Sequence, residues 1–169
     1  MELGETESAA SLALNPLPDS AGARWLVSGD GKGIDFSKAG DKPLLTLRCV
    51  LAAGVKPQLA LIRHAQSAPR AKALFAVLGN GITSRLKLDA KLAREGWRWE
   101  GLYPADAPEL DAFTGQRDIE ATLPGAGTLL IQGSALPREF IAWCRRNGEK
   151  QPAPDAVTSP SPTPPSSKG

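Results

Sequence analysis

The sequence predicts a mainly β fold, an antiparallel β-sandwich or barrel-like sheet with a short helix and a C-terminal helix packed on it. From residue 24 onward apolar and polar residues alternate with a period of two, and Gly, Asn and Pro fill the breaks between the alternating runs. Apolar residues at helical spacing dominate only the end of this region. Many short strands followed by a single strong helix indicate a sheet that uses the helix to cover part of its apolar face.

Seven to nine short strands are expected. The run over residues 44–51 carries its apolar side chains on one face, namely Leu45, Leu47, Cys49 and Leu51. The run over residues 97–102 places Trp97 and Trp99 on the face toward the core. Arg98 and Glu100 then fall on the opposite face. The expected strands cover residues 24–28, 34–36, 44–51, 58–64, 73–78, 82–88, 97–102, 117–123 and 128–131.

Two hairpin turns stand between these runs. Asn80-Gly81 separates two apolar runs, and Asn-Gly favours a two-residue turn because both turn positions need a positive φ. Residues 124–127, Pro-Gly-Ala-Gly, predict a second hairpin. A helix over residues 70–78 that ends at Gly79 is the competing interpretation of the first segment, because Ala, Lys and Leu favour helix.

A glycine cluster at residues 29–33 resembles a loop that holds phosphate. A dinucleotide-binding loop must open a helix, and the residues that follow this cluster have no helical face. The cluster is therefore predicted to be a turn between two strands.

Two helices are expected. Residues 106–115 combine a possible cap at Asp106, an early Pro108 and apolar Leu110 and Phe113, which indicates a short helix that ends at Gly115. The second helix is expected to be capped by Ser134 and to end at Asn147-Gly148. Pro137 lies in its first turn, and its apolar stripe consists of Leu136, Phe140 and Cys144.

Composition divides the 169 residues into three parts. Residues 1–23 are acidic and rich in small and polar residues, which predicts a disordered leader. Residues 151–169 hold 6 of the 15 prolines together with Ser and Thr, which predicts a disordered tail. Residues 24–150 remain as a single β-rich domain.

Charge and hydropathy exclude two classes of protein. The 20 basic and 18 acidic residues nearly balance, and aromatic residues make up only 5% of the chain, so a nucleic-acid partner is not expected. No apolar run approaches the ~18 residues that a membrane-spanning helix needs. The sequence therefore predicts no transmembrane segment.

The first residues carry no export signal, because the first basic residue is Arg24. An acidic leader rich in Ala and Ser is, however, typical of what remains after a signal or lipid anchor upstream has been removed. We therefore expect an exported form of the protein, with an upstream signal or lipoprotein anchor preceding Met1.

His64 lies in the one segment that has the form of an enzyme signature. Residues 59–67, Leu-Ala-Leu-Ile-Arg-His-Ala-Gln-Ser, resemble the motif of the histidine phosphatase family. The resemblance implies that His64 is the phosphate-accepting nucleophile and that Arg63 binds the phosphate. That family also uses a second histidine, and His64 is the only histidine here. The missing second histidine counts against this assignment, and a small phosphohydrolase that uses His64 is kept only as the disfavoured alternative.

No other pattern assigns an active site. A Ser-His-Asp site would need a serine in a nucleophile elbow, and Ser134 is better explained as a helix cap. One histidine and two distant cysteines do not make a zinc shell. No catalytic, cofactor-binding or metal-binding residue is assigned, and no cofactor is expected.

The two cysteines lie on elements that share the core. Cys49 is on the apolar face of a predicted strand, and Cys144 is on the apolar stripe of the last helix. A disulfide between them is predicted, as in proteins of an oxidising compartment. Two unpaired buried thiols in a cytosolic protein are the alternative, because free Cys is among the most buried residues.

The layout of strands, short helix and cysteines is similar to that of small exported proteins of alphaproteobacteria, namely the invasion-associated locus B proteins and a type VI secretion accessory family. The matching positions are Cys49, residues 97–101, 110–113 and 140–144. The resemblance implies an envelope protein without known catalysis.

The function expected from these observations is that of a non-enzymatic periplasmic or envelope-associated binding module whose partner is another envelope protein. The alternatives are the phosphohydrolase above, a barrel that carries a ligand, and a protease inhibitor.

Overall fold

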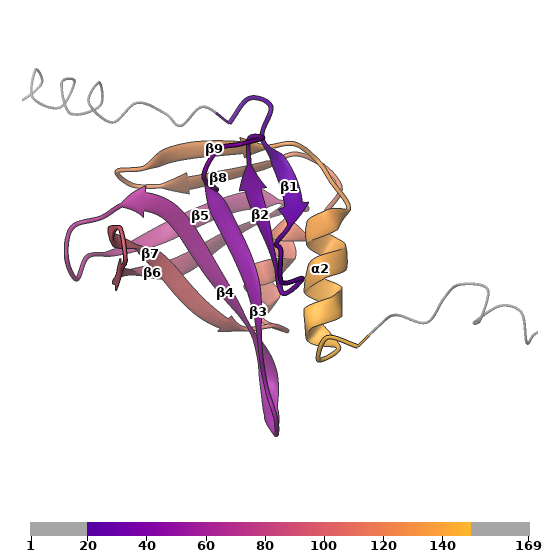
Figure 1. Ribbon diagram of the computed structural model, residues 1–169. Coiled ribbons are helices and arrows are strands. Elements are labelled where there is room, and N and C mark those ends of the chain that lie inside the picture. The colour runs from indigo at the N-terminus through magenta and orange to yellow at the C-terminus, as the bar shows by residue number, and fades with distance from the viewer. Residues whose placement is uncertain (1–19, 150–169) are drawn as a thin grey trace, which may run out of the picture.

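A computed structural model describes residues 20–149 and shows a mainly antiparallel β fold with a C-terminal helix (Figure 1). The predicted leader and tail fall mostly on residues 1–19 and 150–169, which lie outside the described part. Within that part the strands are β1 (Arg24–Val27), β2 (Gly33–Ser37), β3 (Leu45–Ala52), β4 (Val55–Gln66), β5 (Lys72–Gly79), β6 (Ile82–Ala93), β7 (Gly96–Pro104), β8 (Ile119–Leu123) and β9 (Gly127–Ile131).

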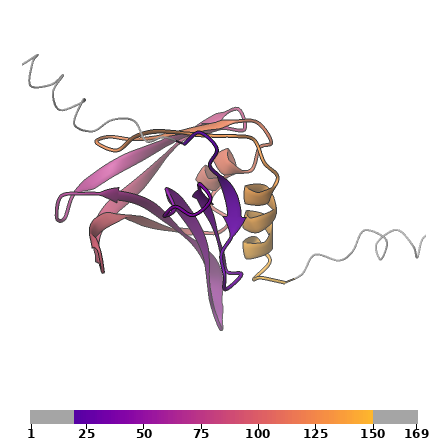
Figure 2. The ribbon, with the colours of Figure 1, turned by 45° about the horizontal axis from the view of Figure 1, so that its top comes forward.

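The nine strands form one antiparallel sheet in the order β1-β2-β3-β4-β7-β6-β5-β8-β9. The sheet curls into a nearly closed barrel, as the two views in Figure 1 and Figure 2 show. Its two ends meet near Ser20, whose hydroxyl oxygen accepts a hydrogen bond of 3.2 Å from the backbone N–H of Leu130. The predicted fold class is confirmed, in its barrel-like form.

The core lies on the inner, concave face of the sheet. Alternate residues of the central strands point inward and are fully buried, among them Leu45, Leu47, Leu59 and Leu61. The aromatic rings of Phe36, Phe75 and Phe113 fill the space between them, and each is at most 1% exposed. Ala23, the last residue of the predicted leader, is 3% exposed and belongs to this core.

The helices differ from expectation at their caps. The segment expected as a short helix is a 3-10 helix, η1 (Pro108–Phe113), preceded by Ala107 instead of a capping Asp106. The final helix, α2 (Leu136–Arg145), has Ala135 at its N-cap position. Ser134 lies one residue further out, where its hydroxyl oxygen accepts a hydrogen bond of 3.2 Å from the N–H of Leu136. Neither Asp106 nor Ser134 therefore occupies the N-cap position that the sequence predicted for it.

The turns follow the sequence prediction. Asn80 and Gly81 have φ values of 55° and 75°, so the hairpin between β5 and β6 is formed as expected. The helix considered over residues 70–78 is wrong, because this segment is the strand β5, paired on one side with β6 and on the other with β8. Hydrogen bonds to β6 along the whole strand, and to β8 at Ala76–Leu78, override the helix propensity of its residues. Residues 29–33 form a turn in which the Asp30 carboxylate accepts the N–H of Lys32.

Two side chains leave the core face on which the alternation placed them. Leu51 is 40% exposed, because an irregularity in the β3–β4 pairing between Val50 and Ala52 changes the alternation there. Trp99 is buried as expected at 6% exposure, whereas Trp97 is only half-buried. Trp97 lies near the turn of the β6–β7 hairpin and lines a surface pocket there.

Candidate functional site

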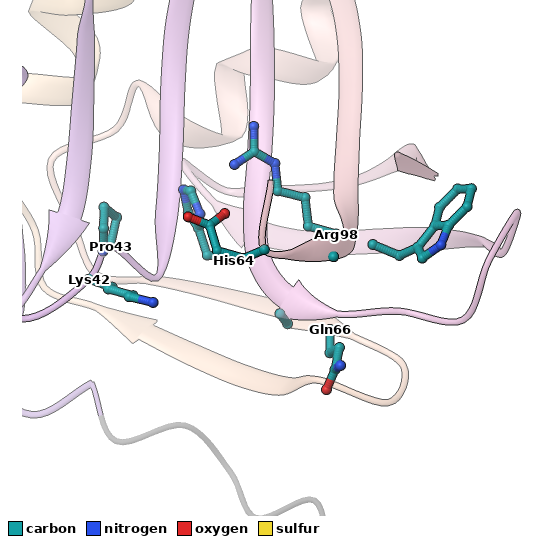
Figure 3. Close-up of a pocket in the computed structure, with 9 residues that line it drawn as sticks. Lys42, Pro43, His64, Gln66 and Arg98 are labelled. Carbon is teal, nitrogen blue, oxygen red and sulfur yellow. The ribbon is translucent and has the colours of Figure 1, made fainter. Parts of the chain in front are cut away.

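A surface pocket of about 410 Å³ lies at the end of β4, and His64 is one of its walls (Figure 3). Three separate segments line it: the loop before β3, the end of β4, and the turn and first residues of β7. Its lining residues are Lys42, Pro43, His64, Ala65, Gln66, Glu95, Gly96, Trp97 and Arg98. The pocket therefore combines two cationic groups, the carboxylate of Glu95, neutral polar groups and apolar groups from parts of the chain that are distant in sequence.

A register shift opens this end of the sheet. Arg63 of β4 is paired with Trp99 of β7, but the next paired residue of β4 is Gln66, opposite Arg98. His64 and Ala65 are thus left out of the ladder with β7, while the N–H of His64 still donates to the carbonyl oxygen of Leu44 on its other side. Such irregularities re-aim side chains, and this one presents His64 to the pocket.

His64 is the end of a chain of hydrogen bonds across three neighbouring strands. The hydroxyl of Thr46 on β3 donates to the carboxylate of Asp35 on β2 at 2.5 Å. The same hydroxyl oxygen lies 2.8 Å from Nε2 of His64. Because the Thr46 proton is directed to Asp35, Nε2 of His64 is assigned as the donor to Thr46. The neutral ring then carries its lone pair on Nδ1.

The surroundings of His64 favour its neutral form. Burial lowers the pKa of His64 below its ordinary value, and the positive charge of Arg98 lowers it further. Arg98 itself is paired with Glu100 on the same strand, at 2.8 Å between Nε and the carboxylate oxygen. The site therefore favours a neutral imidazole beside a partly exposed ion pair.

Arg63 does not lie beside the ring of His64. Consecutive residues of a strand point to opposite faces, so the Arg63 side chain enters the core, where it is 2% exposed. Its guanidinium donates to the carbonyl oxygens of Leu44, at 3.0 Å, and of Ala126, at 3.2 Å. Burial lowers the pKa of Arg63 to about 10. The phosphate-binding role implied by the phosphatase resemblance does not fit this placement, because the pocket is lined by Lys42 and Arg98 instead.

The hydrogen-bonded chain is also unlike a hydrolase triad. In such a triad the carboxylate orients the histidine, and the histidine takes the proton of an accessible hydroxyl. Here the hydroxyl is in the middle, is 5% exposed, and gives its proton to the carboxylate. Thr46 is thus placed to orient His64 and has no access to a substrate.

Neither a metal centre nor a membrane-spanning helix is found in residues 20–149. No group of three or more His, Cys, Asp and Glu side chains there is placed to hold a metal ion. Within the same residues no helix has the length and apolar character needed to cross a membrane.

The predicted disulfide is present. Cys49 of β3 and Cys144 of α2 are bonded, with their Cα atoms 5.6 Å apart. Both residues are buried, at 5% and 0% exposure. The bond fastens α2 to the sheet on the side where β3 and β4 leave the body of the protein.

No protein-family model matches this chain, and the searches of curated proteins and of solved structures also gave no match. The functional interpretation therefore depends on the fold and on the geometry of the site. Of the pocket residues, sequence reasoning singled out His64 but not Lys42, Gln66 or Trp97 as its neighbours. Thr46 and Asp35 carried no local signal beyond polar positions of two strands, because only the register of β2, β3 and β4 brings them together.

Proposed function

We propose that this protein is a non-enzymatic binding module of the periplasm or cell envelope, and that its partner is another envelope protein. The observation that carries the proposal is the chain from Asp35 through Thr46 to His64. It holds a neutral imidazole in one orientation at the wall of a pocket, which suits recognition of a hydrogen-bond donor. The hydroxyl that contacts His64, that of Thr46, is buried and cannot be reached from the pocket.

The pocket suits contact with a protein surface. Trp97 and Pro43 offer apolar area, and Lys42, Gln66 and Arg98 offer hydrogen-bond donors around it. Aromatic residues and arginine are enriched where protein surfaces meet, because they combine large contact area with directional hydrogen bonds. A ligand-carrying barrel is less well supported, since side chains occupy the inner face of the sheet.

The disulfide supports the proposed location. Structural disulfides persist in oxidising compartments and are rare in the cytosol. The Cys49–Cys144 bond is therefore compatible with an envelope location and supports export.

Site-specific photo-crosslinking in the cells that make the protein tests the proposal. A crosslinking residue is introduced at Gln66, which is exposed and lines the pocket, and in a control at Leu130, which is exposed on β9. We expect one discrete protein adduct from position 66, absent from position 130 and lost when His64→Ala and Arg98→Ala are combined with it. Equal adducts at both positions, or none at position 66, would contradict the proposal.

A further inference from the structure

The hairpin that joins β3 to β4 projects from the body of the protein as a narrow ribbon (Figure 1, Figure 2). We call its end, residues 50–56, the β3–β4 tip. All seven of these residues are exposed. Val50, Leu51 and Val55 are 41%, 40% and 56% exposed, so the tip presents aliphatic side chains to the surroundings.

The tip has no charged or polar side chain between Val50 and Val55, where the sequence is Val-Leu-Ala-Ala-Gly-Val. Charged residues come on either side of it: Arg48 precedes it and Lys56 ends it. At the base of the ribbon the N–H of Cys49 donates to the carbonyl oxygen of Lys32, which brings a third basic residue to this end of the molecule. Arg48 is paired with Asp30, and Glu149 lines the hollow beside the tip, so the exposed Lys56 is the basic group that the tip itself presents. An uncharged apolar end with a basic residue at its margin is an arrangement expected where a protein enters an anionic lipid surface.

Both strands of the ribbon contribute apolar groups to the tip. Val50 and Leu51 of β3 and Val55 of β4 are all exposed. The tip has only seven residues, whereas a standard protein interface uses about 20 to 30 residues on each side. So small an apolar end favours a fluid lipid medium over a protein partner.

The base of the ribbon is held to the body of the protein. The Cys49–Cys144 disulfide holds its base to α2. Gly148, just after α2, lies so close to the ribbon that a Cβ atom there would be 2.9 Å from Cδ1 of Leu51. About three residues extend on each strand, and at about 3.3 Å per residue this length matches an interfacial depth of 5 to 10 Å.

We infer that the β3–β4 tip inserts into the interfacial region of an anionic membrane, and that Lys56 at its margin contacts lipid headgroups. The inference is independent of the His64 pocket. In this inference a hairpin makes the membrane contact, since no helix of the described residues is long and apolar enough to span a bilayer.

Sedimentation with lipid vesicles tests this inference on the full, disulfide-bonded chain. Vesicles of phosphatidylglycerol and phosphatidylethanolamine are compared with vesicles of phosphatidylcholine alone. We expect binding to the anionic vesicles, weakened at least tenfold when Val50→Asp and Val55→Asp are combined, and weakened by high salt. The matched control combines Leu92→Asp and Leu130→Asp, at aliphatic side chains that are 69% and 60% exposed elsewhere, and should bind as the unaltered protein does.

A fluorescent reporter gives a second, independent measurement. The unaltered chain already has four tryptophans, so its emission is subtracted. The added emission of Ala53→Trp should shift to shorter wavelength when anionic vesicles are added, whereas that of Leu92→Trp should not. Absence of binding by the unaltered chain, equal binding by the tip variant, or an unshifted Ala53→Trp emission would each overturn the inference. In a further outcome, the tip variant binds vesicles unchanged but loses the protein adduct formed from position 66. That result would overturn the inference and assign the tip to a protein partner.

Discussion

The hydroxyl of Thr46 joins the carboxylate of Asp35 to Nε2 of His64, which lies 2.8 Å from the hydroxyl oxygen. Thr46 can serve both partners only if it donates to one and accepts from the other. This relationship sets the tautomer of the single histidine and defines the chemistry that the pocket presents.

The state of His64 can be measured directly by nuclear magnetic resonance, because the chain has one histidine. The imidazole ¹⁵N shifts are expected to show a neutral ring at pH 7 with its proton on Nε2. The pKa should lie below the ordinary value because of burial and the charge of Arg98. Thr46→Val should release this preference and mix the two tautomers. A ring that is protonated at pH 7 would contradict the assigned hydrogen-bond chain.

The same shift has a consequence for stability. The folded protein binds a proton at His64 less readily than the unfolded chain, so the free energy of unfolding should fall as pH drops below the unfolded pKa of about 6.5. Between about pH 6.5 and 5, before most carboxylates titrate, this decrease should be smaller in His64→Gln, whose amide can still donate to Thr46. Urea titrations of the two proteins over this range measure the difference. If the free energy of unfolding falls equally with pH in the two proteins, His64 is not responsible for the decrease.

Reduction of the disulfide should lower stability substantially. The bond joins residues separated by 95 positions, and for a loop of that size chain entropy predicts roughly 4 to 5 kcal/mol. Because Cys144 holds α2 to β3, hydrogen exchange after reduction should increase first in the helix. Protein isolated from its native compartment and alkylated under denaturing conditions without reductant should take up no alkyl group. Uptake of two groups would remove the support for an oxidising compartment.

The two tryptophans of β7 should respond unequally to truncation. Trp99 is 6% exposed, so Trp99→Ala is expected to cost roughly 3 to 5 kcal/mol in free energy of unfolding. Trp97 is half-buried at the pocket wall, and Trp97→Ala should cost about 1 kcal/mol while weakening partner binding. Chemical denaturation of both variants measures this. Equal costs would place Trp97 in the core, as the simple alternation had predicted.

Removal of the buried Arg63 side chain should also be costly. Arg63→Ala removes the side-chain donor of the Ala126 carbonyl oxygen and one of the two donors of the Leu44 carbonyl oxygen, and it empties a buried position, which together are expected to cost roughly 3 kcal/mol. Arg48→Ala, which removes a half-exposed arginine paired with Asp30, should cost at most about 1 kcal/mol. A small effect at Arg63 would show that water satisfies those carbonyl oxygens in the variant.

The local pattern of the sequence predicted most of the secondary structure, but it left residues 70–78 open between a strand and a helix until the pairing of β5 with β6 and β8 decided it. The period of two predicted the strands, and Asn80-Gly81 predicted a hairpin because few other residues accept a positive φ at both positions. Cys49 and Cys144 were predicted to pair because each lay on an apolar face of an element expected at the core. These features depend on near neighbours in the chain, so a single sequence contains them.

Only the tertiary structure decided which strands lie side by side and what their irregularities expose. The register of β2, β3 and β4 brings Asp35, Thr46 and His64 together, and the shift after Arg63 turns His64 toward the pocket. The irregularity after Val50 likewise exposes Leu51 at the β3–β4 tip. A one-residue change of register moves a side chain to the other face of a sheet, and alternation within one strand contains no information about its partner.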